Sequence, residues 1–171
     1  VSPSVSPSVS PSVSPSVSPS SSPSSAQAEI AITNLGRGAT TNATSLTSDS
    51  VTYTTDALGL VSINSRTGIT EDPVTPTLSG LGLTWVKIAE ILYDATSSSR
   101  RKLSLWRGMG TGASGTLVAD FGSQTQTNAN IIIDQATGVD TSGTNGSGAV
   151  VQSQINSTAS GNALTVTLGA F

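Results

Sequence analysis

Residues 102–121 read KLSLWRGMGTGASGTLVADF, and this stretch decides the predicted fold. Two short runs, Lys102–Arg107 and Thr116–Phe121, lie on either side of a glycine-rich connection. In the first run Leu103 and Leu105 alternate with polar residues, and in the second every other residue is apolar. Alternation with a period of two is the pattern of a half-buried β-strand, and the glycines between the runs are typical of a turn.

The same pattern extends outward in both directions from this stretch. It predicts nine short strands, at Glu29–Asn34, Ser50–Thr55, Leu60–Asn64, Leu83–Tyr93, Lys102–Arg107, Thr116–Phe121, Asn130–Asp134, Ala149–Ser153 and Ala163–Leu168. Only Trp85–Leu92 also has a pattern that a helix would fit. Many short strands separated by turn residues predict an all-β fold, an antiparallel β-sandwich or jelly roll that occupies residues 26–171.

Residues 1–25 contain only valine, serine and proline and form a separate segment. Residues 1–20 repeat Val-Ser-Pro-Ser five times, and 21–24 are a degenerate sixth copy. Proline fixes φ, lacks an N–H and favours an extended preceding residue, so we expect polyproline II or a related extended form. A threefold helix would spread valine and proline over all faces, as in a solvated spacer. A twofold chain would put them on one edge, which suits lateral packing in a filament.

Serine-rich sequence with proline is typical of O-glycosylated stalks, and a bare disordered linker is the alternative. The candidate O-glycosylation sites are the serines at even positions: Ser2, Ser4, Ser6, Ser8, Ser10, Ser12, Ser14, Ser16, Ser18, Ser20, Ser22 and Ser24.

Composition narrows the function classes. Charged residues are 10% of the chain, the net charge is −3, and the sequence contains neither histidine nor cysteine. The absence of a basic stripe argues against nucleic acid as a partner, and no apolar run is long enough to cross a membrane. The chain begins at Val1 inside a repeat, so we expect it to be part of a longer protein. A neutral, hydroxyl-rich composition indicates an extracellular, cell-surface or virion-surface location.

No group of residues indicates catalysis or a cofactor. Glu71 and Asp72 precede a proline and resemble turn residues, and without histidine a serine triad is impossible. The run Asp140–Gly146 has alternating oxygen-bearing side chains, but it departs from a calcium-binding loop, which needs a glutamate where Val151 stands. We therefore expect no enzyme activity, no cofactor and no metal site.

Three further features have a structural and a functional interpretation. Arg100–Lys102 is a basic run that begins a strand and discourages edge pairing, or that contacts an anionic glycan or membrane surface. Trp85 and Trp106 either enter the core, as we expect for at least one, or form a sugar-stacking platform. The N-glycosylation sequons are at Asn42, Asn145 and Asn156.

Residues from about Pro76 to Phe171 resemble a jelly-roll, laminin-G-like β-sandwich domain of phage virion proteins and environmental surface proteins. The stretches that carry this resemblance are Leu78–Trp85, Leu105–Gly110, Phe121–Thr127, Gly138–Gly143 and Leu164–Phe171. The resemblance implies an exposed jelly roll and carries over no catalytic residue. Domains of this kind continue with further strands, which implies an unfinished sandwich whose exposed edge another subunit completes.

Together these features predict a structural subunit of an extracellular fibre, filament or virion appendage, a homo-oligomer carried on a glycosylated stalk. The expected partners are copies of the chain itself, and glycans. The alternative is a carbohydrate-binding or adhesin module displayed on the stalk.

Overall fold

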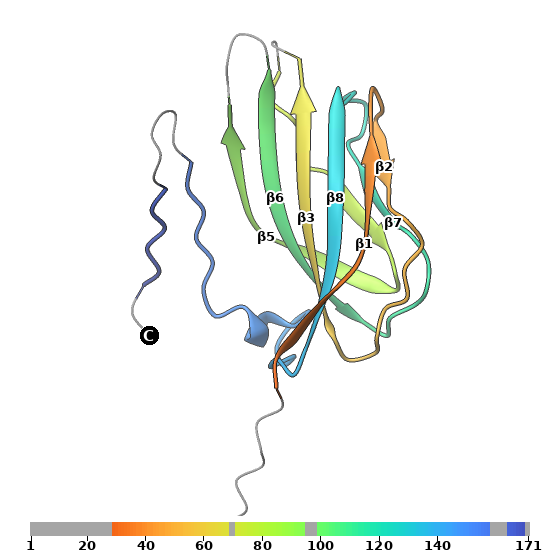
Figure 1. Ribbon diagram of the computed structural model, residues 1–171, viewed down its shortest axis with the longest axis vertical. Helices are drawn as coiled ribbons and strands as arrows, with labels where there is room; N and C mark the ends of the chain where they lie inside the picture. Colours follow the sequence, from red (N-terminus) through yellow and green to blue (C-terminus); the bar gives the residue numbers. More distant parts are fainter. Residues whose placement is uncertain (1–28, 69–70, 95–98, 158–163, 170–171) are drawn as a thin grey trace, which may run out of the picture.

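A computed structural model describes residues 29–68, 71–94, 99–157 and 164–169. The predicted stalk at residues 1–25 lies outside the described residues. The described chain is nearly all β, and the predicted class is confirmed (Figure 1). The elements are β1 (Ala31–Thr40), β2 (Ser45–Thr47), β3 (Leu58–Thr67), β4 (Thr77–Gly80), β5 (Leu83–Tyr93), β6 (Arg100–Gly110), β7 (Leu117–Asp120), β8 (Asn128–Thr137) and the 3-10 turn η1 (Ser147–Ala149).

The strands form two antiparallel sheets. The larger sheet has the order β1-β8-β3-β6-β5, and the smaller has the order β2-β7-β4. The two sheets meet along one side, where the Asp49 N–H donates to the carbonyl of Arg37 in β1 over 2.8 Å. On the other side a tight turn joins β4 to β5, and Leu81 in this turn has a φ of 60°. The arrangement resembles a sandwich with one large and one small sheet.

The core lies between the two sheets and contains side chains from both. Ile63 of β3 and Ile131 of β8 are fully buried, as are Leu117 of β7 and, almost fully, Leu46 of β2. These side chains belong to one contiguous apolar cluster. The alternation predicted for 116–121 is confirmed, since Leu117, Ala119 and Phe121 are buried and the residues between them are not. Burial of this apolar surface is the main favourable contribution to folding.

Strand β6 buries the face opposite to the one that the leucine pattern indicates. Ser104 and Trp106 face the core, whereas Leu103 and Leu105 are half-buried on the outer face. The larger indole of Trp106 shares a face with Ser104, and its Nε1–H donates to Ser104 Oγ over 3.0 Å. Because this hydrogen bond satisfies the polar groups of both side chains, burying them costs little free energy. The large apolar surface of the indole then determines which face of β6 is buried.

Several predicted strand boundaries are wrong. Within Ser50–Thr55 only Val51 pairs, in an isolated bridge to Gly115, and Ala149–Ser153 begins in the 3-10 turn and continues without strand structure. Leu164–Leu168 forms no strand either, and Ala163 lies outside the described residues. The two short strands β2 and β4 were not predicted. Trp85–Leu92, for which a helix was the alternative, lies within β5.

Candidate assembly surface

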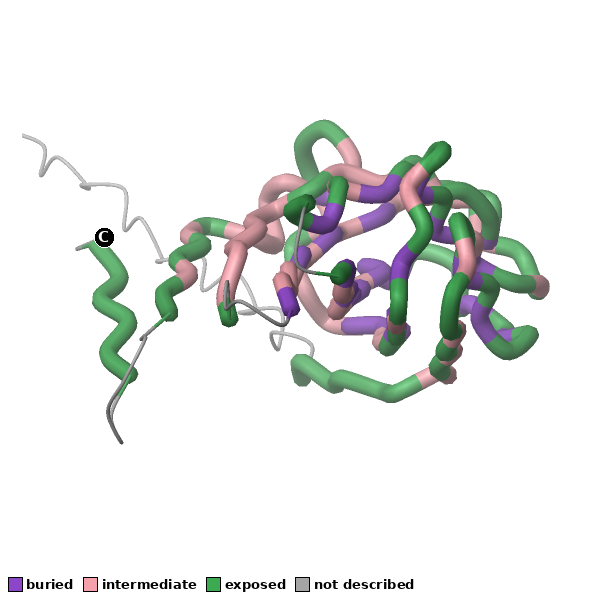
Figure 2. The backbone as a smooth tube through the Cα atoms, turned by 90° about the horizontal axis from the view of Figure 1, so that it is seen from above, coloured by how far each residue is buried: buried purple, intermediate pink, exposed green. Residues whose placement is uncertain are grey.

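The C-terminal segment Leu164–Gly169 exposes its apolar side chains. Leu164, Val166 and Leu168 are 56%, 47% and 54% exposed, and each is separated from the next by a threonine. In the tube view this segment stands apart from the sheets and is exposed along its described length (Figure 2). An exposed apolar row of this kind, alternating with threonines, is unusual for a protein surface.

Two hydrogen bonds hold this segment beside the residues that follow the 3-10 turn. Gln152 Nε2 donates to the carbonyl of Gly169 over 3.0 Å, and Asn156 Nδ2 donates to the carbonyl of Thr165 over 2.9 Å. The two contacts fit one antiparallel register, because Asn156 lies four residues after Gln152 and Thr165 lies four residues before Gly169. The two segments thus form an open hairpin, which we call the C-terminal arm (residues 150–157 and 164–169). Its described residues form no backbone ladder.

Strand β5 forms one edge of the larger sheet. It pairs with β6 over ten positions, and its other side pairs with no strand among the described residues. The register shifts between Lys87 and Ala89, so a bulge divides the edge into two parts. Bulges and charged residues are devices that limit edge-to-edge pairing, and the bulge here leaves two regular parts of five paired residues each, Leu83–Lys87 and Ala89–Tyr93.

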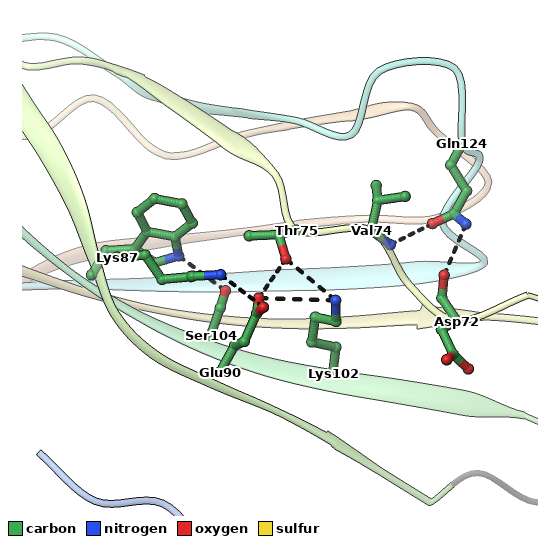
Figure 3. A network of polar contacts seen from close by, with 9 residues as sticks. Asp72, Val74, Thr75, Lys87, Glu90, Lys102, Ser104 and Gln124 are labelled. Carbon is green, nitrogen blue, oxygen red and sulfur yellow. Dashed lines mark hydrogen bonds and ion pairs between the residues drawn. The ribbon is translucent and has the colours of Figure 1, made fainter.

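A polar network fixes β5 to the segment that precedes β4 (Figure 3). Glu90 of β5 accepts a hydrogen bond from Thr75 Oγ1 and forms a 2.7 Å ion pair with Lys87. Lys102 of β6 lies 3.9 Å from the same carboxylate. Partial burial by itself would raise the pKa of Glu90, but the hydrogen bonds from Lys87 and Thr75 and the charges of both lysines outweigh it and lower the pKa. The network therefore stabilises the edge strand most when Glu90 is ionised.

A second set of contacts extends this network toward the loop between β7 and β8. The Val74 N–H donates to Gln124 Oε1 over 2.7 Å, and Gln124 Nε2 donates to the carbonyl of Asp72 over 2.9 Å. Asp72 also pairs with Arg100 at the start of β6. The connection before β4 is thus tied to both sheets, and Asp72 has a structural partner rather than a second carboxylate.

The structure describes the predicted N-glycosylation sites but not the predicted O-glycosylation sites. The twelve candidate serines lie in residues 1–25, outside the described part. Asn42 is exposed and has a positive φ of 51°, and Asn156 is exposed within the C-terminal arm. Asn145 is half-buried beside η1, and its carbonyl accepts a 3.1 Å hydrogen bond from Arg107. N-glycosylation at these three positions stays a prediction.

The two tryptophans form no common exposed platform in the described chain. Trp106 is 8% exposed and belongs to the core, which confirms that at least one tryptophan has a core role. Trp85 packs against the same core from β5, and its indole covers Gly108, where a Cβ would lie 2.7 Å from the ring. Sugar contact at either residue stays a prediction.

Asp140 begins the loop that was compared with a calcium site. Hydrogen bonds from the side chain and the backbone N–H of Ser142 lower the pKa of Asp140, and the backbone bond is 2.9 Å long. This is the geometry of an ordinary turn in which aspartate caps its own loop. Among the described residues no three acidic side chains gather as metal ligands would.

No protein-family model, no curated protein and no solved structure matches this chain. In the part of the chain that the structure describes, no helix has the length and apolar character needed to cross a membrane.

Proposed function

We propose that this protein is a structural subunit that assembles with copies of itself into an extracellular fibre, filament or virion appendage. The observation that carries the proposal is the C-terminal arm, in which exposed leucine and valine side chains alternate with threonines on a segment that stands apart from both sheets (Figure 2). A strand-like segment with one apolar side gains stability when it pairs with a sheet and buries that side.

The unpaired edge of β5 is the surface on which a second copy would place this segment. Residues Ala89–Tyr93 have unused backbone donors and acceptors on one side, and five residues match the length of Leu164–Leu168. Each subunit would then donate an arm to one neighbour and accept an arm from another. A head-to-tail contact of this kind that does not close into a ring produces a filament.

In this proposal the Val-Ser-Pro-Ser repeat is an O-glycosylated stalk and the β domain is a jelly roll that serves as the unit of assembly. Glycans on the serines of residues 1–25 would keep an extended chain hydrated and apart from its neighbours. Intact-mass spectrometry of protein from its native source tests this part, since a mass equal to that of the bare polypeptide would exclude modification.

Sedimentation of the purified full-length chain over a range of concentrations tests the assembly itself. We expect polymers from the unchanged chain and monomers from a variant with Leu164→Ser, Val166→Ser and Leu168→Ser. The matched control replaces Thr165 and Thr167 by serine, which keeps the apolar row and should keep the polymers. A monomeric unchanged chain, or equal assembly by both variants, would contradict the proposed role of the arm.

A further inference from the structure

One end of the larger sheet carries arginines and asparagines together on its outer face. Strand register places Arg66 of β3 opposite Arg101 of β6 on one side and opposite Asn128 of β8 on the other. In the next outward-facing row Asn64 lies opposite Asn130. We call these five residues the arginine–asparagine patch.

The patch lies on the face that points away from the smaller sheet. Ser65 and Thr67, the neighbours of Arg66 along β3, are 2% and 4% exposed and lie on the opposite, buried face. Side chains along a strand alternate between faces, so Arg66 must lie on the outer one. The residues of the patch, with Thr127, line a recess of about 340 Å³. This volume lies within the range of small-ligand sites.

The charges in this recess are not balanced by the described residues. Two arginines that lie directly opposite each other on neighbouring strands repel, which destabilises the pair unless an anion lies nearby. Asp94 Oδ2 lies 3.2 Å from Nε of Arg101 and compensates that arginine. Within the described ranges Arg66 has no carboxylate partner. The positive charge of Arg66 therefore remains uncompensated by the described residues.

Hydrogen bonding shows the same deficit. Nε of Arg66 and Nε of Arg101 are both buried and lack an aligned acceptor, since the Asp94 carboxylate approaches Arg101 without alignment to its N–H. A buried donor without an acceptor destabilises the folded protein. An oxyanion bound by the two guanidinium groups would supply both the missing charge and additional acceptors, because the planar guanidinium fork matches carboxylate and sulfate geometry.

The asparagines add hydrogen-bonding groups that a site for a simple anion would not require. Each amide offers two donors and one acceptor oxygen, which is the combination that sugar hydroxyl groups require. Asn64 is held in place, because its Nδ2 donates to the Tyr93 hydroxyl over 2.6 Å, and Tyr93 lies opposite Arg101 across β5 and β6. The recess thus joins one positioned amide group, that of Asn64, to an uncompensated arginine.

The strand alternation also explains why only one residue of the basic run contributes to this recess. Arg100 pairs with Asp72, and Lys102 lies beside Glu90 in the polar network, so both have acidic partners in the described structure. Arg101 alternates with them and lies on the outer face. The run begins an interior strand rather than an edge, which corrects the expectation that it discourages edge pairing.

From these observations we infer that the arginine–asparagine patch binds an acidic sugar, a saccharide that carries a carboxylate or a sulfate group. The oxyanion lies between Arg66 and Arg101, and the hydroxyl groups of the ring contact the asparagine amides. This binding site goes beyond the structural role proposed above and does not depend on self-assembly.

Titration of the full-length chain with three probes tests the inference. Glucuronate and glucose 6-sulfate distinguish the two oxyanions, and glucose is the neutral control. Binding is measured by calorimetry and by the NMR resonances of the arginine Nε–H groups. We expect saturable binding of at least one acidic probe, no detectable binding of glucose, and shifted Nε–H resonances of Arg66 and Arg101.

Variants at Arg66 identify the site. Arg66→Gln should weaken binding of the acidic probe about tenfold or more, because a charge-assisted hydrogen-bonding pair is lost. Arg66→Lys keeps the charge but removes the fork, and we expect it to weaken binding as well. Arg37→Gln makes the same change at an exposed arginine of β1 that does not line the recess, and should leave binding unchanged.

Stability without ligand supplies a second readout. Arg66→Gln should leave the thermal midpoint of the free protein unchanged or higher, because it removes a repulsive pair and a buried unpaired donor. The inference is overturned if neither acidic probe binds saturably to the unchanged chain, if glucose binds as tightly as they do, or if Arg66→Gln binds as the unchanged chain does.

Discussion

Replacing Ile131 of β8 by alanine should destabilise the domain far more than the same change at Ile132. Both side chains stand in the run Ile131-Ile132-Ile133, but Ile131 is fully buried between the sheets and Ile132 is 45% exposed on the outer face. Each change removes three carbon atoms. At about 0.8 kcal/mol per buried carbon the transfer contribution at Ile131 is about 2.4 kcal/mol, and the cavity left behind raises the total to about 3–4 kcal/mol.

At Ile132 about half of the side chain is already in water, and no closed cavity forms. The expected loss there is about 1 kcal/mol. Denaturant unfolding followed by the fluorescence of the buried Trp106 measures both values, and Ile133→Ala, also at a fully buried position, repeats the first. Equal losses at Ile131 and Ile132 in the monomeric state would refute the assignment of inner and outer faces on which the assembly surface and the sugar site depend.

Three further predictions concern packing and titration. Gly108→Ala would place a Cβ 2.7 Å from the Trp85 ring and should cost about 1–3 kcal/mol in unfolding free energy, whereas Gly68→Ala, with no atom within 4 Å, should change it little. The lowered pKa of Glu90 means that its contribution to stability is present above its ordinary pKa and is lost as the pH falls through the lowered value, so Glu90→Gln should flatten the acid limb of a stability–pH curve. Burial raises the pKa of Tyr53 to about 12, against a weaker opposing effect of a hydrogen bond with the Gly59 backbone, so stability should fall as the pH rises from about 10 toward 12, and Tyr53→Phe should remove that dependence.

The sequence predicts two of the strands particularly well. The pattern of Thr116–Phe121 is confirmed in β7, and the span Leu83–Tyr93 agrees with β5 at both ends. The three-residue strand β2 is too short for a period to be recognised. Alternation alone does not show whether a strand finds a partner, which is why Leu164–Leu168 has the pattern of a strand and forms none among the described residues.

Face assignment and side-chain pairing depend on contacts between residues far apart in the chain. The run of three isoleucines in β8 has no alternation, so only the sheet register shows that Ile132 faces outward. Arg66 and Arg101 become neighbours through the pairing of β3 with β6, and no local sequence motif indicates that these two residues meet. The basic run and the apolar C-terminal segment were recognised from sequence, but their surroundings were not.

Cryo-electron microscopy of particles from the native source tests self-assembly through the C-terminal arm most directly. We expect a filament in which Leu164–Leu168 of each copy lies along Ala89–Tyr93 of the next, with additional density on the serines of residues 1–25. Separate monomers in which Leu164–Leu168 pairs with the β5 of its own chain, and serines that carry no density beyond the side chain, would contradict the proposal.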